Sequence, residues 1–443
     1  MKKFIIVSLL FISFSLVYGQ DVVKLNLDKS IEIALKNNHD LKIASFQKQI
    51  AEEQVSEAFG SSVLPQIKGT ANYNRALKRG VVIIETPVFS GSFPAGTENT
   101  LSVGATLEQP LFTGAVFFAT SIANTYAEIS EKSYYSTKAE LIKNVTKAYY
   151  SFLLSKEFLE LSQITLKSTE DNLKNTQAMF NAGIVPEYDL LRAKVEYQNA
   201  LPEVESAKNS ITLAGNSLKI LLGLDLSEQV VTEDSIVYNK IDIKSEPELT
   251  SQFLKNNYTL TGLKLQIDLQ DKAASYQFSK NFPELYFNAN WNSQAQENDP
   301  RPFNRWRYKN SVYIGFNLKI PLFDGWQTTS RVEQAELDLQ IAKETYAKTE
   351  KALKNSLDEK VLKLKEKEFQ VDAYKTAIEQ ASLGYEYAKK RYSNGIGTQL
   401  ENVDALVAVT RAKVNYLNAI YQYYSLYADL QELLSSSEVI ENN

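Results

Sequence analysis

Four segments of the chain alternate apolar and polar side chains with a period of two, which is the pattern of a β-sheet with two different faces. They lie at residues 65–77, 101–109, 283–293 and 311–320. Strands of about ten residues suit a bilayer that tilted strands cross. A soluble antiparallel sheet packed on a helix would show the same alternation, so the pattern leaves both open. The polar connections 78–100 and 294–308 are expected to be loops, and they fit the external loops of a barrel.

Two further segments have the length and composition of very long helices. Residues 116–180 and 328–392 contain no proline, and each runs for roughly 65 residues, or about 100 Å at the rise of an α-helix. Each leads through a glycine-containing turn into a second helical segment, at 187–222 and 398–434. The sequence therefore predicts two long antiparallel coiled-coil hairpins in each chain.

The two halves of the chain repeat one another in the same order at a spacing of about 210 to 220 residues. The first repeat, 20–245, contains a helix, strands 65–77 and 101–109, a long helical hairpin to 222 and a junction segment 223–245. The second, 246–434, contains a helix, strands 283–293 and 311–320, and a long helical hairpin. The matched landmarks are Leu64-Pro65-Gln66-Ile67 with Phe282-Pro283-Glu284-Leu285, Pro110-Leu111-Phe112-Thr113-Gly114 with Pro321-Leu322-Phe323-Asp324-Gly325, and Phe180-Asn181-Ala182-Gly183 with Tyr392-Ser393-Asn394-Gly395.

The first 19 residues have the pattern of an export signal. Lys2 and Lys3 precede an apolar run that ends at Val17, and small residues allow cleavage before Gln20. The run is shorter than the roughly 20 residues that a single membrane anchor needs. At the other end, residues 435–443 are expected to form a disordered tail.

Composition narrows the classes of function. The chain has no cysteine and one histidine, His39, so we expect neither a disulfide nor a transition-metal site. A formal net charge of −5 argues against nucleic acid as a partner. No phosphate-binding loop or nucleophile elbow is present, so we expect no cofactor and no enzymatic activity.

The strands set a geometric condition on assembly. Strands in lipid must close into a barrel of at least about eight, because an open edge leaves backbone groups unpaired. Two copies of this chain would give eight strands and a nearly filled interior, whereas three would give twelve strands and a wider lumen. The polar face favours a wet lumen and hence a homotrimer. We therefore expect an α+β membrane protein: a trimeric twelve-stranded β-barrel, four strands per subunit, continued by a long antiparallel α-helical coiled-coil tunnel, with an internal duplication.

These landmarks resemble the TolC-like outer-membrane efflux family over nearly the whole mature chain. The resemblance rests on the segment from Leu27 to Leu35 and on Asn38, on the Leu-Pro-Gln-Ile and Pro-Leu-Phe-x-Gly elements, and on the glycine turns. It implies an efflux duct in the outer membrane of a Gram-negative bacterium, with a periplasmic helical domain that docks to a periplasmic adaptor and an inner-membrane pump. A periplasmic coiled-coil adaptor or adhesin without a pore remains the alternative.

Two acids just beyond the second turn are the candidate pore constriction. Glu401 and Asp404 stand three residues apart and share one helix face, so a threefold axis would make two stacked acidic rings. They match the paired acids that narrow the entrance in the family. Glu401 also completes a capping box that begins at Thr398. In the other hairpin the equivalent positions carry Asp189 and Arg192.

The resemblance also assigns a gate and a docking surface. Asp189 and Tyr392 match positions that hydrogen-bond between neighbouring hairpins and hold the entrance closed. Tyr188 and Gly397 depart from the family pattern, which puts that closing network in question. The turns are the expected adaptor contact, with Ala182, Gly183, Ile184 and Val185 in one and Asn394, Gly395, Ile396 and Gly397 in the other.

Overall fold

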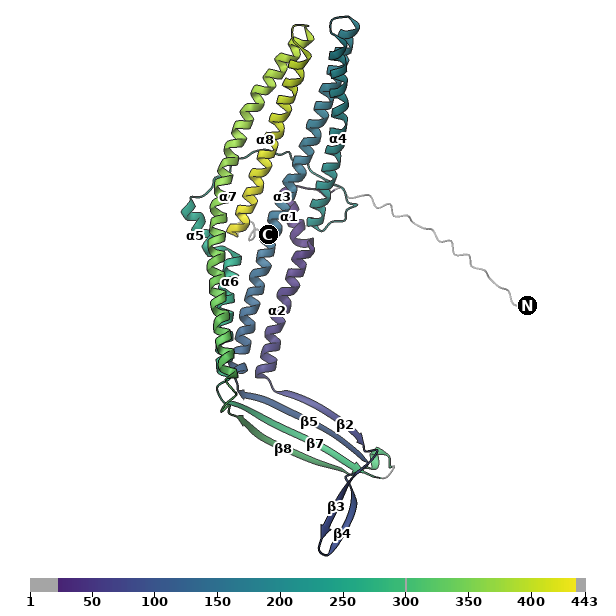
Figure 1. The fold of residues 1–443 in the computed structure, drawn as a ribbon, viewed down its shortest axis with the longest axis vertical. Coiled ribbons are helices and arrows are strands. Elements are labelled where there is room, and N and C mark those ends of the chain that lie inside the picture. Colours follow the sequence, from purple (N-terminus) through teal and green to yellow (C-terminus); the bar gives the residue numbers. More distant parts are fainter. Residues whose placement is uncertain (1–22, 299–300, 436–443) are drawn as a thin grey trace, which may run out of the picture. The chain divides into compact units, whose positions relative to one another are not determined.

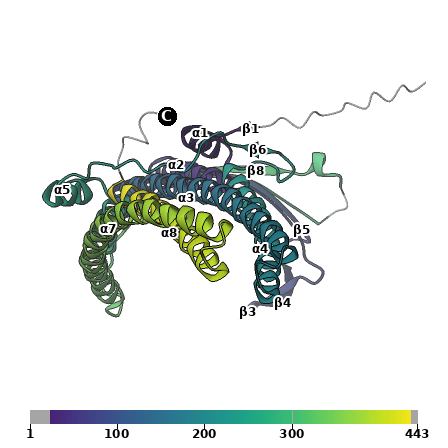
Figure 2. The ribbon, with the colours of Figure 1, turned by 90° about the horizontal axis from the view of Figure 1, so that it is seen from above.

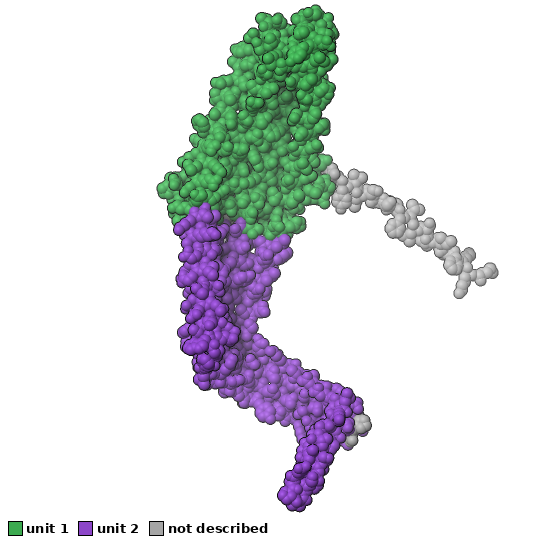
Figure 3. Space-filling view, viewed as in Figure 1, with its two compact units in different colours: residues 1–42, 137–256, 354–443 green, residues 43–136, 257–353 purple. Residues whose placement is uncertain are grey.

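The computed structural model describes residues 23–298 and 301–435, which form an α+β structure of two compact units (Figure 3). The first unit comprises residues 23–42, 137–256 and 354–435, and the second comprises 43–136 and 257–353. Each unit takes segments from both sequence repeats, so the repeats 20–245 and 246–434 are not themselves compact domains. The expected export signal, 1–19, and all but the first residue of the expected tail, 435–443, lie outside the described residues.

The second unit contains a four-stranded antiparallel sheet in the order β2-β5-β7-β8. Its strands are β2 (Gln66–Arg75), β5 (Asn99–Phe112), β7 (Glu284–Glu297) and β8 (Tyr308–Lys319). The pairing of β5 with β7 joins the two halves of the chain. Strands β5 and β7 run several residues beyond the expected ranges 101–109 and 283–293, because the backbone ladder continues past the apolar alternation.

The register brings the apolar side chains of all four strands to one face. Ala105 lies opposite Trp291, and Trp291 lies opposite Val312. Tyr73 of β2 pairs with Leu101 of β5 in the same way. A slip of one residue would move a strand's whole apolar set to the other face, so the alternation specifies this register. The prediction of a two-faced sheet is confirmed.

Among the described residues, no α-helix covers the apolar face of this sheet, and only its end at Tyr73 is covered, where the rings of Phe303 and Trp306 pack against the Tyr73 ring. Val312, Ile314 and Phe316 of β8 are 69%, 75% and 72% exposed. Figure 1 shows the four strands extending away from the helices of the same unit. This exposure does not fit the alternative of a soluble sheet whose apolar face packs on a helix. Within residues 23–298 and 301–435, no helix combines the length and the apolar character that a membrane span requires.

The connection 78–100, expected to be a loop, contains a separate two-stranded hairpin. Strands β3 (Gly80–Thr86) and β4 (Phe89–Ala95) pair antiparallel and join through a two-residue turn. The Thr86 hydroxyl closes this turn, because it accepts from the Phe89 N–H and donates to the Phe89 carbonyl, both at 3.0 Å. The other connection contains a short 3-10 helix, η1 (Phe303–Arg305).

The helix that opens each repeat is broken once, at an asparagine. Helices α1 (Leu27–Asn37) and α2 (His39–Val63) meet at Asn38, and helices α5 (Glu246–Asn256) and α6 (Tyr258–Ser279) meet at Asn257. The Asn38 side chain accepts from the Leu41 N–H at 3.0 Å, and Asn257 accepts from the Leu260 N–H at 2.9 Å. Each asparagine therefore caps the second helix of its pair.

The long helices form two hairpins, with α3 (Gly114–Asn181) followed by α4 (Glu187–Leu222), and α7 (Gln327–Ser393) followed by α8 (Gln399–Leu434). In the first unit they lie in one curved layer, with α1 on its convex side (Figure 2). Stacked rings of Tyr150 and Tyr424, 4.2 Å apart, hold α3 against α8. An ion pair of 2.6 Å between Lys147 and Asp429 adds to this contact.

The junction segment 223–245 is held by two buried tyrosines of α8. The Tyr423 hydroxyl accepts from the Ile241 N–H, and the Tyr424 hydroxyl accepts from the Asn239 N–H, both at 3.0 Å. Within this segment β6 (Val230–Val231) pairs in parallel with β1 (Val23–Lys24). These tyrosines therefore act as packing and anchoring residues.

Candidate functional site at the tips of the helical hairpins

Both hairpins end in the same backbone turn. Gly183 and Gly395 have φ of 73° and 75°, a left-handed conformation that glycine adopts without a Cβ clash. The N–H of the residue after each glycine returns to the helix, from Ile184 to the Met179 carbonyl and from Ile396 to the Arg391 carbonyl. This arrangement is a Schellman cap. It leaves Ile184 and Ile396 63% and 73% exposed.

Tyr392 links the two hairpins, but its partner is Thr176. The Tyr392 hydroxyl lies 3.0 Å from Thr176 Oγ1 of α3, and both side chains are buried. Burial raises the pKa of Tyr392, the hydrogen bond with Thr176 lowers it, and the Asp189 carboxylate raises it again. The net shift is upward, so the phenol stays protonated at neutral pH. Asp189 thus acts on Tyr392 through charge.

Glu401 lies in the first turn of α8, and only half of the expected capping box forms. The Thr398 hydroxyl accepts from the Glu401 N–H at 3.2 Å. The Glu401 carboxylate instead faces Arg391, with 3.7 Å between Nη2 and Oε2. Gly397 places no side chain beside this pair. A Cβ at this position would lie 3.2 Å from Glu401 Oε2 and 3.1 Å from the Tyr392 backbone nitrogen, so the space beside the pair is narrow. Arg391 is therefore the basic residue beside Glu401.

Asp404 lies one turn further along α8 and is exposed. No ion pair joins it to another side chain in the part of the chain that the structure describes. The two acids therefore have different surroundings, since Glu401 forms an ion pair with Arg391 and Asp404 forms none among the described residues.

A cleft of about 400 Å³ lies between the two turns. It brings together the expected gate residues Asp189 and Tyr392 and part of the expected adaptor surface, whereas Glu401 and Asp404 are not among its lining residues. Its walls are formed by Met179, Ile184, Val185, Pro186, Tyr188, Asp189, Arg192, Tyr392, Gly395, Gly397, Thr398, Gln399 and Leu400.

Two buried polar side chains of α8, Gln399 in the wall of this cleft and Asn402 nearby, lie between the hairpins. Gln399 is 1% exposed, and its amide nitrogen and oxygen have no hydrogen-bond partner among the described residues. Asn402 donates to the Asn172 side chain at 2.9 Å, but its own side-chain oxygen is likewise unpartnered there. Sequence reasoning missed Thr176, Gln399 and Asn402, because a polar residue on a long helix resembles an ordinary solvated position.

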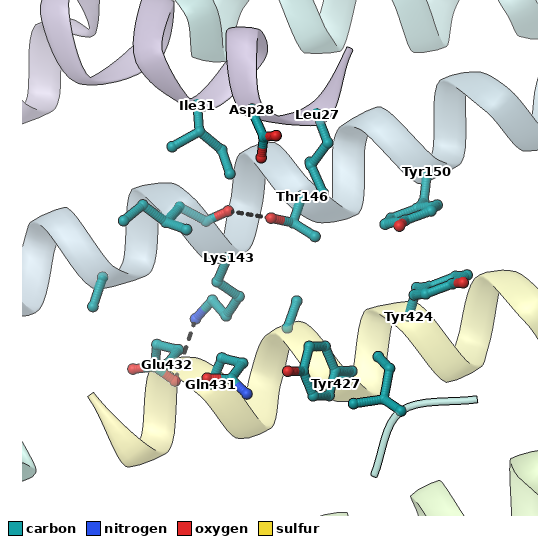
Figure 4. A pocket seen from close by; sticks show the side chains of 14 residues that line it. Leu27, Asp28, Ile31, Lys143, Thr146, Tyr150, Tyr424, Tyr427, Gln431 and Glu432 are labelled. Atoms are coloured by element: carbon teal, nitrogen blue, oxygen red, sulfur yellow. Dashed lines mark hydrogen bonds and ion pairs between the residues drawn. The ribbon is translucent and has the colours of Figure 1, made fainter. Parts of the chain in front are cut away.

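A second, smaller cavity of about 220 Å³ lies between α1, α3 and α8 (Figure 4). Its lining is mainly apolar, with the stacked Tyr150 and Tyr424 at one end and Lys143 3.9 Å from Glu432 at the other. Burial raises the pKa of Glu432, and Lys143 opposes that shift. No cluster of three or more potential metal ligands occurs in residues 23–298 and 301–435.

The chain matches a known family over most of its length. The family model described as "Outer membrane efflux protein" matches residues 30–224 and 249–436. Among relatives, the outer membrane protein TolC of Vibrio cholerae is 26% identical over 94% of this chain and 93% of that protein. The alkaline protease secretion protein AprF of Pseudomonas aeruginosa is 24% identical over 95% of this chain and 87% of that protein.

Solved structures share the fold. The Campylobacter jejuni CmeC outer membrane channel superposes with a TM-score of 0.77 at 20% identity, covering 94% of this chain and 88% of that one. The open state of the Neisseria gonorrhoeae MtrE outer membrane channel gives 0.75 at 17% identity, covering 93% of this chain and 89% of that one. The chain therefore belongs to the outer membrane efflux protein family, which identifies it as a TolC-like efflux duct in the outer membrane of a Gram-negative bacterium.

Proposed function

We propose that three copies of this chain form the duct, with a closed twelve-stranded barrel in the lipid. The observation that carries this proposal is the four-stranded sheet, whose apolar face is largely uncovered and whose edges, β2 and β8, have no further strand partner among the described residues. Unpaired backbone groups at such edges are unfavourable in lipid. Pairing β8 of one copy with β2 of the next removes every edge when three copies close.

The two faces of the sheet suit lipid outside and water inside. The apolar face would contact acyl chains. The other face carries mainly amide and hydroxyl side chains, including Asn72, Thr106, Asn290 and Asn292. Most of its charged residues lie toward the ends of the strands that join the helices, where Glu284 and Lys319 are 3.7 Å apart, and Lys309 lies at the opposite end of β8. A lumen lined this way would hydrate many solutes and select among them weakly.

The helical hairpins would form the wall of a periplasmic tunnel that narrows at the tips. Glu401 and Asp404 of three copies would form two acidic rings, with Arg391 weakening the Glu401 ring. The Tyr392–Thr176 bond, with Asp189 nearby, would hold neighbouring hairpins together in the closed state. Gly397 contributes no side chain to this closure.

The exposed turns would be the contact for a periplasmic adaptor that connects the duct to an inner-membrane pump. The isoleucines at the two turns supply the apolar contact area for such a partner. The relatives include proteins named for efflux and one named for secretion of a protease. Small molecules and polypeptides are therefore both candidate cargoes.

Conductance tests the duct against the alternative of an adaptor or adhesin without a pore. Purified protein should form channels in a planar bilayer, should have the native mass of three subunits in mild detergent, and should stay in the outer-membrane fraction after a high-salt wash. Release into the soluble fraction without conductance would favour the alternative. A conducting monomer would refute the trimer.

A further inference from the structure

We infer that the β3–β4 hairpins of three copies pack against one another at the outer mouth of the duct, through one apolar face. This inference rests on the proposed trimer. Registered pairs of an antiparallel ladder share a face, so Val82 lies beside Phe93, and Thr86 lies beside Phe89. The complete face consists of Gly80, Val82, Ile84, Thr86, Phe89, Gly91, Phe93 and Ala95.

The two faces of the hairpin differ in chemistry. The first face carries no charge, and its rings of Phe89 and Phe93 stack 5.8 Å apart over Gly91. A Cβ at Gly91 would lie 2.9 Å from the Phe89 ring, so glycine is what lets the rings close over the backbone. The opposite face carries Glu85, together with Val81, Ile83, Ser90, Ser92 and Pro94. We call the first the phenylalanine face.

The phenylalanine face has no cover within the described chain. Ile84 and Phe93 are 43% and 46% exposed, and β3 pairs only with β4 in this part of the structure. An isolated two-stranded hairpin is marginally stable in water. An uncharged apolar face on such a hairpin therefore requires a partner surface.

The base of the hairpin indicates which surface that is. The Ala76 N–H donates to the Glu98 carbonyl at 2.7 Å, and the Glu98 N–H donates to Asn298 at 2.8 Å, which ties the hairpin to the rim of the sheet. It follows directly on β2, the edge across which the next copy must pair if the sheet is to close. The nearest protein surface is then a second copy of the same rim. Three identical uncharged faces around a threefold axis can cover one another.

The absence of cysteine allows a clean cross-linking test. Ile84→Cys places a thiol on the phenylalanine face, and Ile83→Cys places one on the opposite face, one residue away on the same strand. In isolated outer membranes under mild oxidation, Ile84→Cys should give a disulfide-linked dimer of subunits several-fold more efficiently than Ile83→Cys. Equal yields, or no dimer from Ile84→Cys, would overturn the inference.

Two controls separate this result from the proposed function. Native mass measured on the same samples reports whether trimers form. Trimers without the face-specific cross-link contradict only the hairpin contact, whereas an absence of trimers contradicts the proposed function itself. Differently tagged copies, expressed in separate cells and mixed after extraction, reveal contacts between trimers. Cross-links that join the two tags would also overturn the inference.

A stability measurement uses a matched pair of double variants. Val82→Ser with Ile84→Ser removes apolar surface from the phenylalanine face, and Val81→Ser with Ile83→Ser makes the same changes on the other face. Each double variant replaces one valine and one isoleucine of β3 by serine, so both lose the same β-strand propensity. The first should lower the temperature at which the trimer dissociates in detergent, and the second should leave it nearly unchanged. Equal shifts would show that the hairpins do not pack through this face.

Discussion

Arg391 alters the charge at the proposed entrance, although it lies before the turn and the acids lie after it. Its guanidinium is 3.7 Å from Glu401, while Asp404 has no such neighbour among the described residues. Both side chains of the pair are about half exposed, so the ion pair contributes at most about 1 kcal/mol to stability. Its effect on a pore is larger, because carboxylates gathered around an axis focus the field.

We predict that selectivity follows this charge pattern. Glu401→Ala with Asp404→Ala should abolish cation preference, because fixed carboxylates attract cations. Arg391→Gln should increase cation preference, since it releases the Glu401 charge. Reversal potentials in a planar bilayer under a salt gradient measure both effects. Unchanged selectivity together with a clear loss of stability would show that the acids stabilise the N-terminus of α8 and do not control ion selectivity.

A second residue-scale prediction concerns the link between the hairpins. Tyr392→Phe removes the hydrogen bond to Thr176 and leaves a buried hydroxyl without that partner, which costs about 1–3 kcal/mol. The closed entrance should weaken, and single-channel conductance should rise. Thr176→Val should act in the same direction, and the double variant should show less than the sum of the two effects. Fully additive effects on conductance would mean that the pair does not act as a unit.

At the scale of elements, each repeat uses an asparagine to end one helix and begin the next. Asn38 also donates to the Leu221 carbonyl at 2.9 Å, which ties the break to the end of α4. The amino-acid composition from α1 through α2 is compatible with one continuous helix. The break depends on the side-chain oxygen that replaces a backbone acceptor at the new helix start.

Removing a cap should therefore destabilise the protein measurably. Asn257→Ala should lower the free energy of unfolding by about 0.5–2 kcal/mol. Asn38→Ala should also lower it, because the cap on Leu41 and the hydrogen bond to the Leu221 carbonyl are both lost. Asn257→Asp retains the acceptor and is the matched control. Thermal unfolding in detergent measures all three, and an Asn257→Asp variant as unstable as Asn257→Ala would argue against the cap.

The turns of the two helical hairpins are where we expect the adaptor to dock. Ile184→Asp or Ile396→Asp places a charge in an exposed apolar position, so efflux should be lost while trimer level and outer-membrane location stay unchanged. Asn181→Asp adds the same charge beside the first turn without removing an apolar side chain, and it should retain efflux. Normal efflux in both isoleucine variants would count against docking at the turns.

At the scale of the whole molecule, the duplicated halves are interleaved. Strand β5 of the first half pairs with β7 of the second, and Tyr150 of the first stacks on Tyr424 of the second. Each half by itself would keep only two of the four strands of the sheet. The contacts between repeats are therefore part of each compact unit.

We predict that residues 20–245 and 246–434 do not fold when each is produced alone. Each should be digested by a protease under conditions that leave the full chain intact. Mixing the two halves during refolding should restore resistance, because the contacts between repeats can then form. A protease-resistant single half would contradict this interleaving.

The elements themselves could be predicted because their signals are local. Alternation with a period of two marked the four strands of the sheet, long stretches without proline marked α3 and α7, and glycine marked the turns. The β3–β4 hairpin was missed because glycine and proline, which resemble loop signals, flank the apolar run of β3 and occur within β4. Its pairing depends on a cross-strand register that no single run reveals.

The sequence by itself determined the two-faced strands, the helical hairpins and their turns, because each follows from the spacing of residues a few positions apart. Only the tertiary structure decided which polar residues meet. Thr176 and Tyr392 are 216 residues apart and form a buried hydrogen bond because the two helical hairpins meet near their tips. Arg391 reaches Glu401 because the chain reverses between them. Such pairs depend on packing and chain reversal, which a local pattern of polar and apolar positions does not encode.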